Sequence, residues 1–158
     1  MPTDRLLSSL LTPDRVRVGL DAPTKADVLR GVVALAATSP AVLDADRLLA
    51  DVEAREATLS TGVGGGLALP HARSAAVRET VAALATLAAP VDFDALDGAP
   101  VRLVLLLAGP DGDPGAHVRL LSRVSRLMSR DAVRERLMAA ADPTDFCEAL
   151  AEAEAALV

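Results

Sequence analysis

The stretch Val101-Arg102-Leu103-Val104-Leu105-Leu106-Leu107-Ala108 decides the fold, because it is apolar at every position except Arg102. Pro100 precedes this stretch and Gly109-Pro110 follows it, and such residues mark the ends of a single element. A short, continuous apolar run is typical of a central strand that is covered on both faces. A membrane helix would need about 20 apolar residues, so we expect no direct membrane insertion.

The segments on either side of this strand alternate between extended and helical patterns. Further strands are predicted over residues 16–20, 67–70 and 81–89, and helices over residues 24–37, 44–57, 131–139 and 143–157. Another helix begins at Pro114, with Asp113 as its N-cap, and Thr24 is the predicted N-cap of the first helix. Because strands and helices interleave, we predict an α/β fold, a three-layer sandwich with a mixed, mainly four- to five-stranded sheet between helices. Residues 1–158 are expected to form a single domain, with its core from about 12 to 150.

The composition restricts the partners and the compartment. Hydrophobic residues make up 51% of the 158-residue chain and aromatic residues only 1%, so the core must consist of Ala, Val and Leu. The net charge of −6 and the single lysine, Lys25, argue against a nucleic-acid partner, which needs a basic face. Cys147, interpreted as a small core residue, is the only cysteine, which excludes an intrachain disulfide and a cysteine-based zinc site. Residues 1–12 contain no evident secretory signal, so we expect a cytoplasmic protein.

A glycine-rich loop that ends in a histidine carries the strongest functional signal: Ser60-Thr61-Gly62-Val63-Gly64-Gly65-Gly66-Leu67-Ala68-Leu69-Pro70-His71. Glycines cluster where the backbone takes unusual angles or approaches a ligand closely. Successive backbone N–H groups in such a loop can bind an anion. The loop therefore predicts a phosphate site formed by Thr61, Gly62, Gly64, Gly65 and Gly66. The dinucleotide fingerprint and the Walker A motif are both absent, so we expect no nucleotide cofactor.

Three side chains are candidates for chemistry at this loop. His71 follows a proline that ends a strand, and a neutral imidazole is an accepted nucleophile. His117 lies in the first turn of the helix after Asp113, where the field of the helix favours a neutral ring and an anionic ligand. Arg55 precedes the loop and has the fork that holds phosphoryl oxygens. The alternatives are a structural histidine, a surface histidine, and an arginine paired with a neighbouring glutamate. Arg73 and Ser74 are weaker candidates for the same site, and two histidines alone make a weak case for a metal.

Together these segments resemble the enzyme IIA domain of the bacterial phosphoenolpyruvate:sugar phosphotransferase system, of the fructose/mannitol/nitrogen-regulatory type. The similarity extends from about Thr12 to Leu150 and is carried, in the family's order, by residues 55–56, 60–73, 91–93, 96–98, 101–107 and 117–121. The chain departs from the family where Gly65 replaces a common asparagine, and where Val63 and Leu67 replace isoleucines.

The resemblance implies a phosphoryl relay, in which the chain is a phosphotransferase component without a cofactor or a metal. His71 would accept the phosphoryl group from an HPr or HPr-like phosphocarrier and pass it to a IIB domain, which serves the IIC permease. His117 would donate a hydrogen bond to the phosphoryl group, and Arg55 would neutralise its charge. We expect an apolar docking rim that uses Val63, Leu67 or Leu69.

Two outputs of the relay remain open from the sequence. The run Pro70-His71-Ala72-Arg73-Ser74 favours uptake and phosphorylation of a fructose-type sugar. The alternative is a nitrogen-type regulatory IIA protein, whose phosphorylation state controls binding to target proteins. A third alternative, an interaction domain without catalysis, is disfavoured because both His71 and His117 are present.

Overall fold

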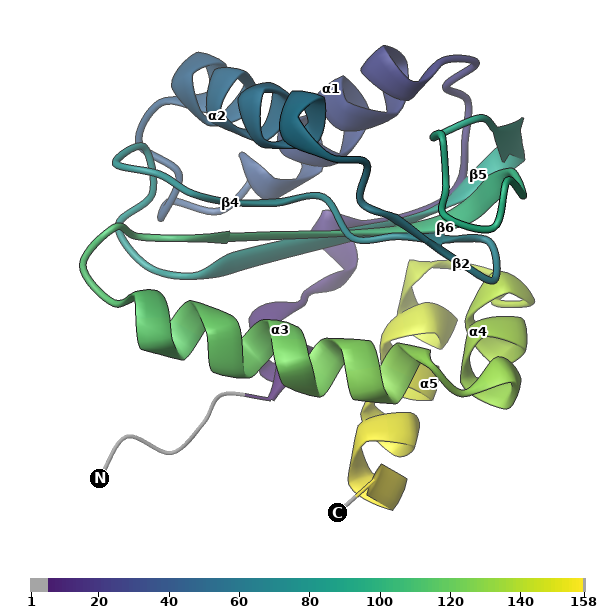
Figure 1. The fold of residues 1–158 in the computed structure, drawn as a ribbon. Coiled ribbons are helices and arrows are strands. Elements are labelled where there is room, and N and C mark those ends of the chain that lie inside the picture. The colour runs from purple at the N-terminus through teal and green to yellow at the C-terminus, as the bar shows by residue number, and fades with distance from the viewer. Residues whose placement is uncertain (1–5, 158) are drawn as a thin grey trace.

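The computed structural model describes residues 6–157, which form a six-stranded sheet between two layers of helices (Figure 1). Two short 3-10 helices, η1 (Leu7–Leu10) and η2 (Pro13–Arg15), precede the sheet. One face of the sheet is covered by α1 (Lys25–Ala36) and α2 (Ala45–Thr58). The other face is covered by α3 (Pro114–Met128), α4 (Asp131–Met138) and α5 (Pro143–Leu157). The predicted three-layer α/β sandwich is therefore confirmed.

The sheet is mixed, with strand order β1-β5-β6-β3-β2 and with β4 also paired to β6. Its strands are β1 (Val16–Leu20), β2 (Gly62–Gly64), β3 (Leu67–Ala68), β4 (His71–Arg73), β5 (Val81–Val91) and β6 (Val101–Gly109). Strand β6 is antiparallel to β5 and parallel to β3 and β4. The sheet has more strands than the four to five that were predicted, because β2 and β4 were missed. Each has only three residues, too few to show a period in the sequence.

Strand β6 lies between the two cores, as its continuous apolar sequence predicts. Val104 and Leu106 belong to the core under α1 and α2, whereas Leu103, Leu105 and Leu107 belong to the core under α3 to α5. All five side chains are at most 1% exposed. The alternation follows from the two-residue repeat of a strand, so one strand links both halves of the hydrophobic interior.

The helices begin at the predicted capping residues. The Oγ1 atom of Thr24 accepts a hydrogen bond from the N–H of Asp27 at 3.2 Å. An Asp113 carboxylate oxygen accepts from the N–H of Ala116 at 3.0 Å, with Pro114 in the first helical position. Both caps satisfy an N–H group that the helix itself leaves open. Within residues 6–157, no helix is long and apolar enough to cross a membrane.

The composition of the core differs from the prediction in two details. Phe93 and Phe146, the only aromatic side chains of the sequence, are both fully buried and supplement the aliphatic interior. Cys147, predicted as a small core residue, is only half-buried and packs against the edge of the core under α3 to α5. Burial raises the pKa of its thiol, so Cys147 is not an activated nucleophile.

Candidate functional site

His71 is the first residue of β4, where the sheet holds its backbone opposite Leu107 of β6. The sequence placed it just beyond the end of a strand over residues 67–70. In the structure, β3 ends at Ala68, and a new strand begins at His71 after a break of two residues. The Nδ1 atom of His71 lies 2.7 Å from the carbonyl oxygen of Leu69. Because a carbonyl can only accept, we assign the proton to Nδ1, which leaves the lone pair of Nε2 for chemistry.

His117 packs beside His71 from the first turns of α3. The centroids of the two rings are 5.9 Å apart, with the rings tilted at 45°. The side chain is buried, and neither ring nitrogen has a hydrogen-bond partner within residues 6–157. Burial lowers the pKa of His117, and the electrostatic influence of His71 and Arg73 lowers it further. The site therefore holds a neutral imidazole whose polar atoms have no partner, which is unusual for a buried group unless a ligand completes it.

The close approach of His117 to the sheet depends on Gly109, which the sequence pattern indicated only as the end of a strand. A Cβ atom at Gly109, the last residue of β6, would lie 2.9 Å from Nδ1 of His117. Any side chain there would push the imidazole away from β6. The sequence shows a glycine at the end of the central strand. The reason for this glycine is its contact with His117, which lies eight residues later in the chain.

Arg55 shares a cavity of about 300 Å³ with His71. It lies in the last turn of α2, and its Nη1 donates a hydrogen bond to the carbonyl oxygen of Leu59 at 3.0 Å. A pairing with Glu56 was one alternative for this arginine, but Glu56 forms its ion pair with Lys25 instead, at 2.7 Å. The structure therefore brings together all three predicted side chains, because Arg55 and His71 line one cavity and His117 lies against His71.

Glu56 anchors the start of the glycine-rich loop, a role that was not predicted from the sequence. Its carboxylate is 5% exposed and accepts hydrogen bonds from the N–H of Thr61 at 3.0 Å and from the Thr61 hydroxyl at 2.5 Å. Lys25, the only lysine, balances the charge and lies 5.1 Å from the centre of the Phe93 ring. Because α1, α2 and the loop meet here only after folding, the cluster could not be found from spacing along the chain.

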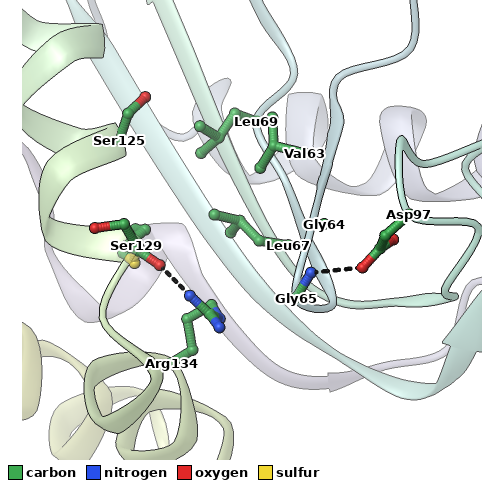
Figure 2. Close-up of a pocket in the computed structure, with 10 residues that line it drawn as sticks. Val63, Gly64, Gly65, Leu67, Leu69, Asp97, Ser125, Ser129 and Arg134 are labelled. Carbon is green, nitrogen blue, oxygen red and sulfur yellow. Dashed lines mark hydrogen bonds between the residues drawn. The ribbon is translucent and has the colours of Figure 1, made fainter.

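The glycines themselves form a tight β2–β3 hairpin rather than an open phosphate cradle. Gly64, Gly65 and Gly66 all have positive φ, at 99°, 65° and 80°. The N–H of Gly62 donates to the Ser60 hydroxyl at 3.1 Å, and that of Gly65 donates to Asp97 at 3.0 Å. Gly64 and Gly65 line a second cavity (Figure 2). It adjoins the His71 cavity, because the two share lining residues. Of the five residues predicted to form the phosphate site, Thr61 lines the His71 cavity.

The two weaker candidates differ in position. Arg73 is exposed on β4 and acts on the site through its charge, as the lowered pKa of His117 indicates. Ser74 is buried, and its hydroxyl donates to a carboxylate oxygen of Asp51 at 2.6 Å, so it ties the end of β4 to α2. Among residues 6–157, no group of three or more His, Cys, Asp or Glu side chains is arranged to hold a metal ion.

An apolar rim surrounds the His71 cavity, although it differs from the predicted one. Leu67 and Leu69 are buried, at 3% and 5% exposure, so only Val63 of the three predicted residues is exposed. Leu59 and Leu96 join it, and all three exposed side chains line the cavity. We call Leu59, Val63 and Leu96 the apolar rim. Such a rim is typical of a docking surface for another protein.

The sequence matches one family model and is similar to several known proteins. The family model for the phosphoenolpyruvate-dependent sugar phosphotransferase system, EIIA 2, matches residues 9–153. A nitrogen regulatory protein from Pseudomonas aeruginosa is 39% identical over 134 residues, which are 85% of this chain and 87% of the relative. A fructose-specific EIIA component from Haloferax volcanii is 34% identical over 146 residues, which are 91% of this chain and 94% of the relative.

The fold leads to the same family. The crystal structure of the nitrogen regulatory protein IIA-Ntr from Neisseria meningitidis is similar with a TM-score of 0.84 at 29% sequence identity, covering 91% of this chain and 98% of that one. The resemblance in the sequence is thus confirmed, and the chain belongs to the EIIA 2 family of the phosphoenolpyruvate-dependent sugar phosphotransferase system.

Proposed function

We propose that the chain carries a phosphoryl group on Nε2 of His71, between a phosphocarrier protein and a second acceptor. The observation that carries this proposal is the pair of imidazoles. The Leu69 carbonyl holds the proton of His71 on Nδ1, and His117 lies beside it with both ring nitrogens unpartnered within residues 6–157. One ring is thus oriented as a nucleophile, and the other is placed to bind what the first one receives.

The accepting step follows from this orientation. The Nε2 lone pair of His71 attacks the phosphorus of a phosphohistidine on an HPr or HPr-like phosphocarrier. A new N–P bond forms while the N–P bond of the carrier breaks, and the electron pair of the broken bond returns to the carrier's imidazole. The Nδ1 proton stays hydrogen-bonded to the Leu69 carbonyl throughout. No proton therefore has to leave the site when the phosphoryl group arrives.

The neighbouring groups stabilise the phosphoryl charge, which is the main task of a protein in such a transfer. His117 is neutral because burial lowers its pKa, and one ring N–H can donate to a phosphoryl oxygen. Arg55 lines the same cavity as His71 and can bring a guanidinium to the other oxygens. A neutral donor and one arginine give moderate binding, which suits a protein that must also release the group.

The relay has two candidate outputs. In transport, the phosphoryl group passes to a IIB domain, at a cysteine in fructose-type systems, and from there to a sugar brought in by the IIC permease. In regulation, the phosphorylation state of His71 controls binding to target proteins. The 34% identical fructose-specific relative supports the first output. The 39% identical nitrogen regulatory relative and the likeness to IIA-Ntr support the second.

A phosphorylation assay tests the proposal. The chain is incubated with phosphoenolpyruvate, enzyme I and the cognate phosphocarrier, and the product is examined for an acid-labile, base-stable phosphate. We expect one phosphate on the wild type and none on His71→Ala. His117→Ala should still take up the label but transfer it onward more slowly. A wild type that stays unlabelled with its cognate carrier would overturn the proposal.

A second assay separates the two outputs. The phosphorylated chain is mixed with the IIB domains encoded in the same genome, and loss of the label is followed with time. Transfer to a IIB cysteine within seconds supports transport. A label that stays on His71 in the presence of every IIB domain supports regulation, and the phosphorylated and unphosphorylated forms are then compared for protein binding.

A further inference from the structure

A second cavity of about 530 Å³ lies between the β2–β3 hairpin and the C-terminal half of α3 (Figure 2). It adjoins the His71 cavity, because Val63, Leu69 and Ser125 line both. The hairpin leads to His71 through Leu69, whose carbonyl orients the nucleophile. Helix α3 carries His117 near its other end. The separation between hairpin and helix therefore influences how the two imidazoles face each other.

Arg134 of α4 lines this cavity at the end away from Leu69 and Ser125 (Figure 2). Its Nη1 donates a hydrogen bond to the carbonyl oxygen of Met128, the last residue of α3, at 2.7 Å. Its Nη2 forms an ion pair with Asp131. The side chain is only 15% exposed. Arg134 is thus a held guanidinium and not a free surface arginine.

The same guanidinium lies against the tip of the hairpin. A Cβ atom at Gly65 would be 2.8 Å from Nη2 of Arg134, 2.9 Å from Cζ and 3.0 Å from Nε. On the hairpin's other side, Asp97 accepts the N–H of Gly65 at 3.0 Å (Figure 2). Gly65 is therefore held between a carboxylate from the β5–β6 connection and a guanidinium from α4.

The backbone alone does not explain why position 65 is a glycine. Its φ of 65° lies in the left-handed region, which asparagine adopts several times more readily than most other residues. A Cβ atom there would lie 2.8 to 3.0 Å from three atoms of the guanidinium group, so the guanidinium that Met128 and Asp131 hold in place would have to shift. Gly65 therefore leaves the guanidinium of Arg134 in the position from which it bonds to the end of α3.

We propose that Arg134 is a positioning residue for phosphoryl transfer, which locks the glycine turn to the end of α3 and so fixes His71 relative to His117. This inference rests on the proposed function of the two histidines. A misplacement of about 1 Å at reacting groups can cost as much as a hundredfold in rate. Because Arg134 would hold the β2–β3 hairpin and α3 at one distance, its loss should lower the transfer rate at saturating phosphocarrier more than the affinity for the phosphocarrier.

A double-mutant cycle tests the pair. Gly65→Asn places a side chain in the space of the guanidinium, and we expect the transfer rate at saturating phosphocarrier to fall about tenfold. Arg134→Ala removes the lock and should lower the rate about threefold to tenfold, with the KM for the carrier unchanged. In the double variant, the asparagine fits the vacated space. The transfer rate of the double variant should therefore equal that of Arg134→Ala alone. It should not fall by the product of the two single-variant factors.

Two controls distinguish positioning from a general loss of stability. Arg136→Ala removes another α4 arginine, which pairs with Asp145 at the surface, and it should transfer at the wild-type rate. Arg134→Lys keeps the charge but not the planar fork, and it should not restore the rate. Rates are compared at a temperature where urea titration shows every variant to be folded. Multiplicative losses in the double variant, or single variants as fast as Arg136→Ala, would overturn the inference.

One readout does not depend on transfer at all. The side-chain nitrogen shifts of His71 and His117 report tautomer and environment in the unphosphorylated protein. Arg134→Ala should broaden or move both sets of signals, and Arg136→Ala should leave them unchanged. Shifts that stay fixed in Arg134→Ala contradict the positioning role, even if the wild type takes no phosphate and the relay itself is wrong.

Discussion

At the scale of single residues, the site depends on the hydrogen bonds that its two histidines make and lack. His71 has one firm partner, the Leu69 carbonyl, whereas His117 has none within residues 6–157. The sequence was sufficient to single out both histidines and Arg55. It could not reveal Gly109, Glu56 or Arg134, because each acts through a contact that exists only after distant elements have packed. One of the three departures from the family, Gly65, lies at such a contact, against the guanidinium of Arg134.

The buried state of His117 has a measurable consequence for stability. Burial lowers the pKa of His117 below its ordinary value of 6.5, so the unfolded chain binds a proton at a higher pH than the folded chain does. The free energy of unfolding therefore decreases as the pH falls through 6.5, and this loss ends below the folded pKa. We expect His117→Gln, which cannot titrate, to lose less stability than the wild type between pH 7.5 and pH 5.5. Urea titrations at the two pH values measure this, and equal losses in both proteins contradict it.

At the scale of elements, long segments were predictable and short ones were not. The continuous apolar run of β6 and the capping residues of α1 and α3 located those elements to within one or two residues. Strands β2 and β4 were missed because their pairing, rather than their composition, makes them strands. This matters for the site, since β4 holds His71 and the β2–β3 hairpin leads to it. The local sequence pattern thus predicted the long strand and the helices. The short strands that hold the site depend on pairing across the sheet.

The attachment of η1 to α5 is an element-scale contact that can be tested directly. Glu154 of α5 is 2% exposed and accepts the N–H groups of Leu7 at 2.5 Å and Ser8 at 2.8 Å. Glu154→Ala leaves these donors without an acceptor, and hydrogen bonds to a charged group contribute about 1.5–3 kcal/mol each. We expect a loss of about 2–3 kcal/mol in the free energy of unfolding, measured by urea titration. The exposed Glu152→Ala should change it by less than about 0.5 kcal/mol, and a similarly small loss in Glu154→Ala would rule out the anchoring role.

At the scale of the whole molecule, the apolar rim and His71 line one cavity, and His117 lies beside His71. Most large hydrophobic side chains are buried under the two helical layers, whereas three exposed ones, Leu59, Val63 and Leu96, gather at the cavity of His71. This grouping suits the docking of a protein partner. The sequence alone predicted the layers. Two of the three predicted rim residues, Leu67 and Leu69, are instead buried in the core under α3 to α5.

Docking on the rim can be separated from effects on folding by two leucines of equal exposure. Leu59 lines the His71 cavity and Leu43 does not, yet both are 62% exposed. Leu59→Ser should raise the KM for the phosphocarrier about tenfold, since a truncated contact residue often costs more than 1 kcal/mol in binding. Leu43→Ser should leave the KM unchanged, and both variants should unfold at the wild-type urea midpoint. Equal KM values for the two variants would show that the rim does not contact the carrier.

The position of the phosphate on the imidazole tests the central claim most directly. The chain is phosphorylated through enzyme I and the phosphocarrier, and phosphorus and nitrogen NMR then identify the bonded ring atom. Because the Leu69 carbonyl holds the proton on Nδ1, we predict a single phosphate on Nε2 of His71 and no signal in His71→Ala. A phosphate on Nδ1 of His71, or on His117, would contradict the assignment of the nucleophile.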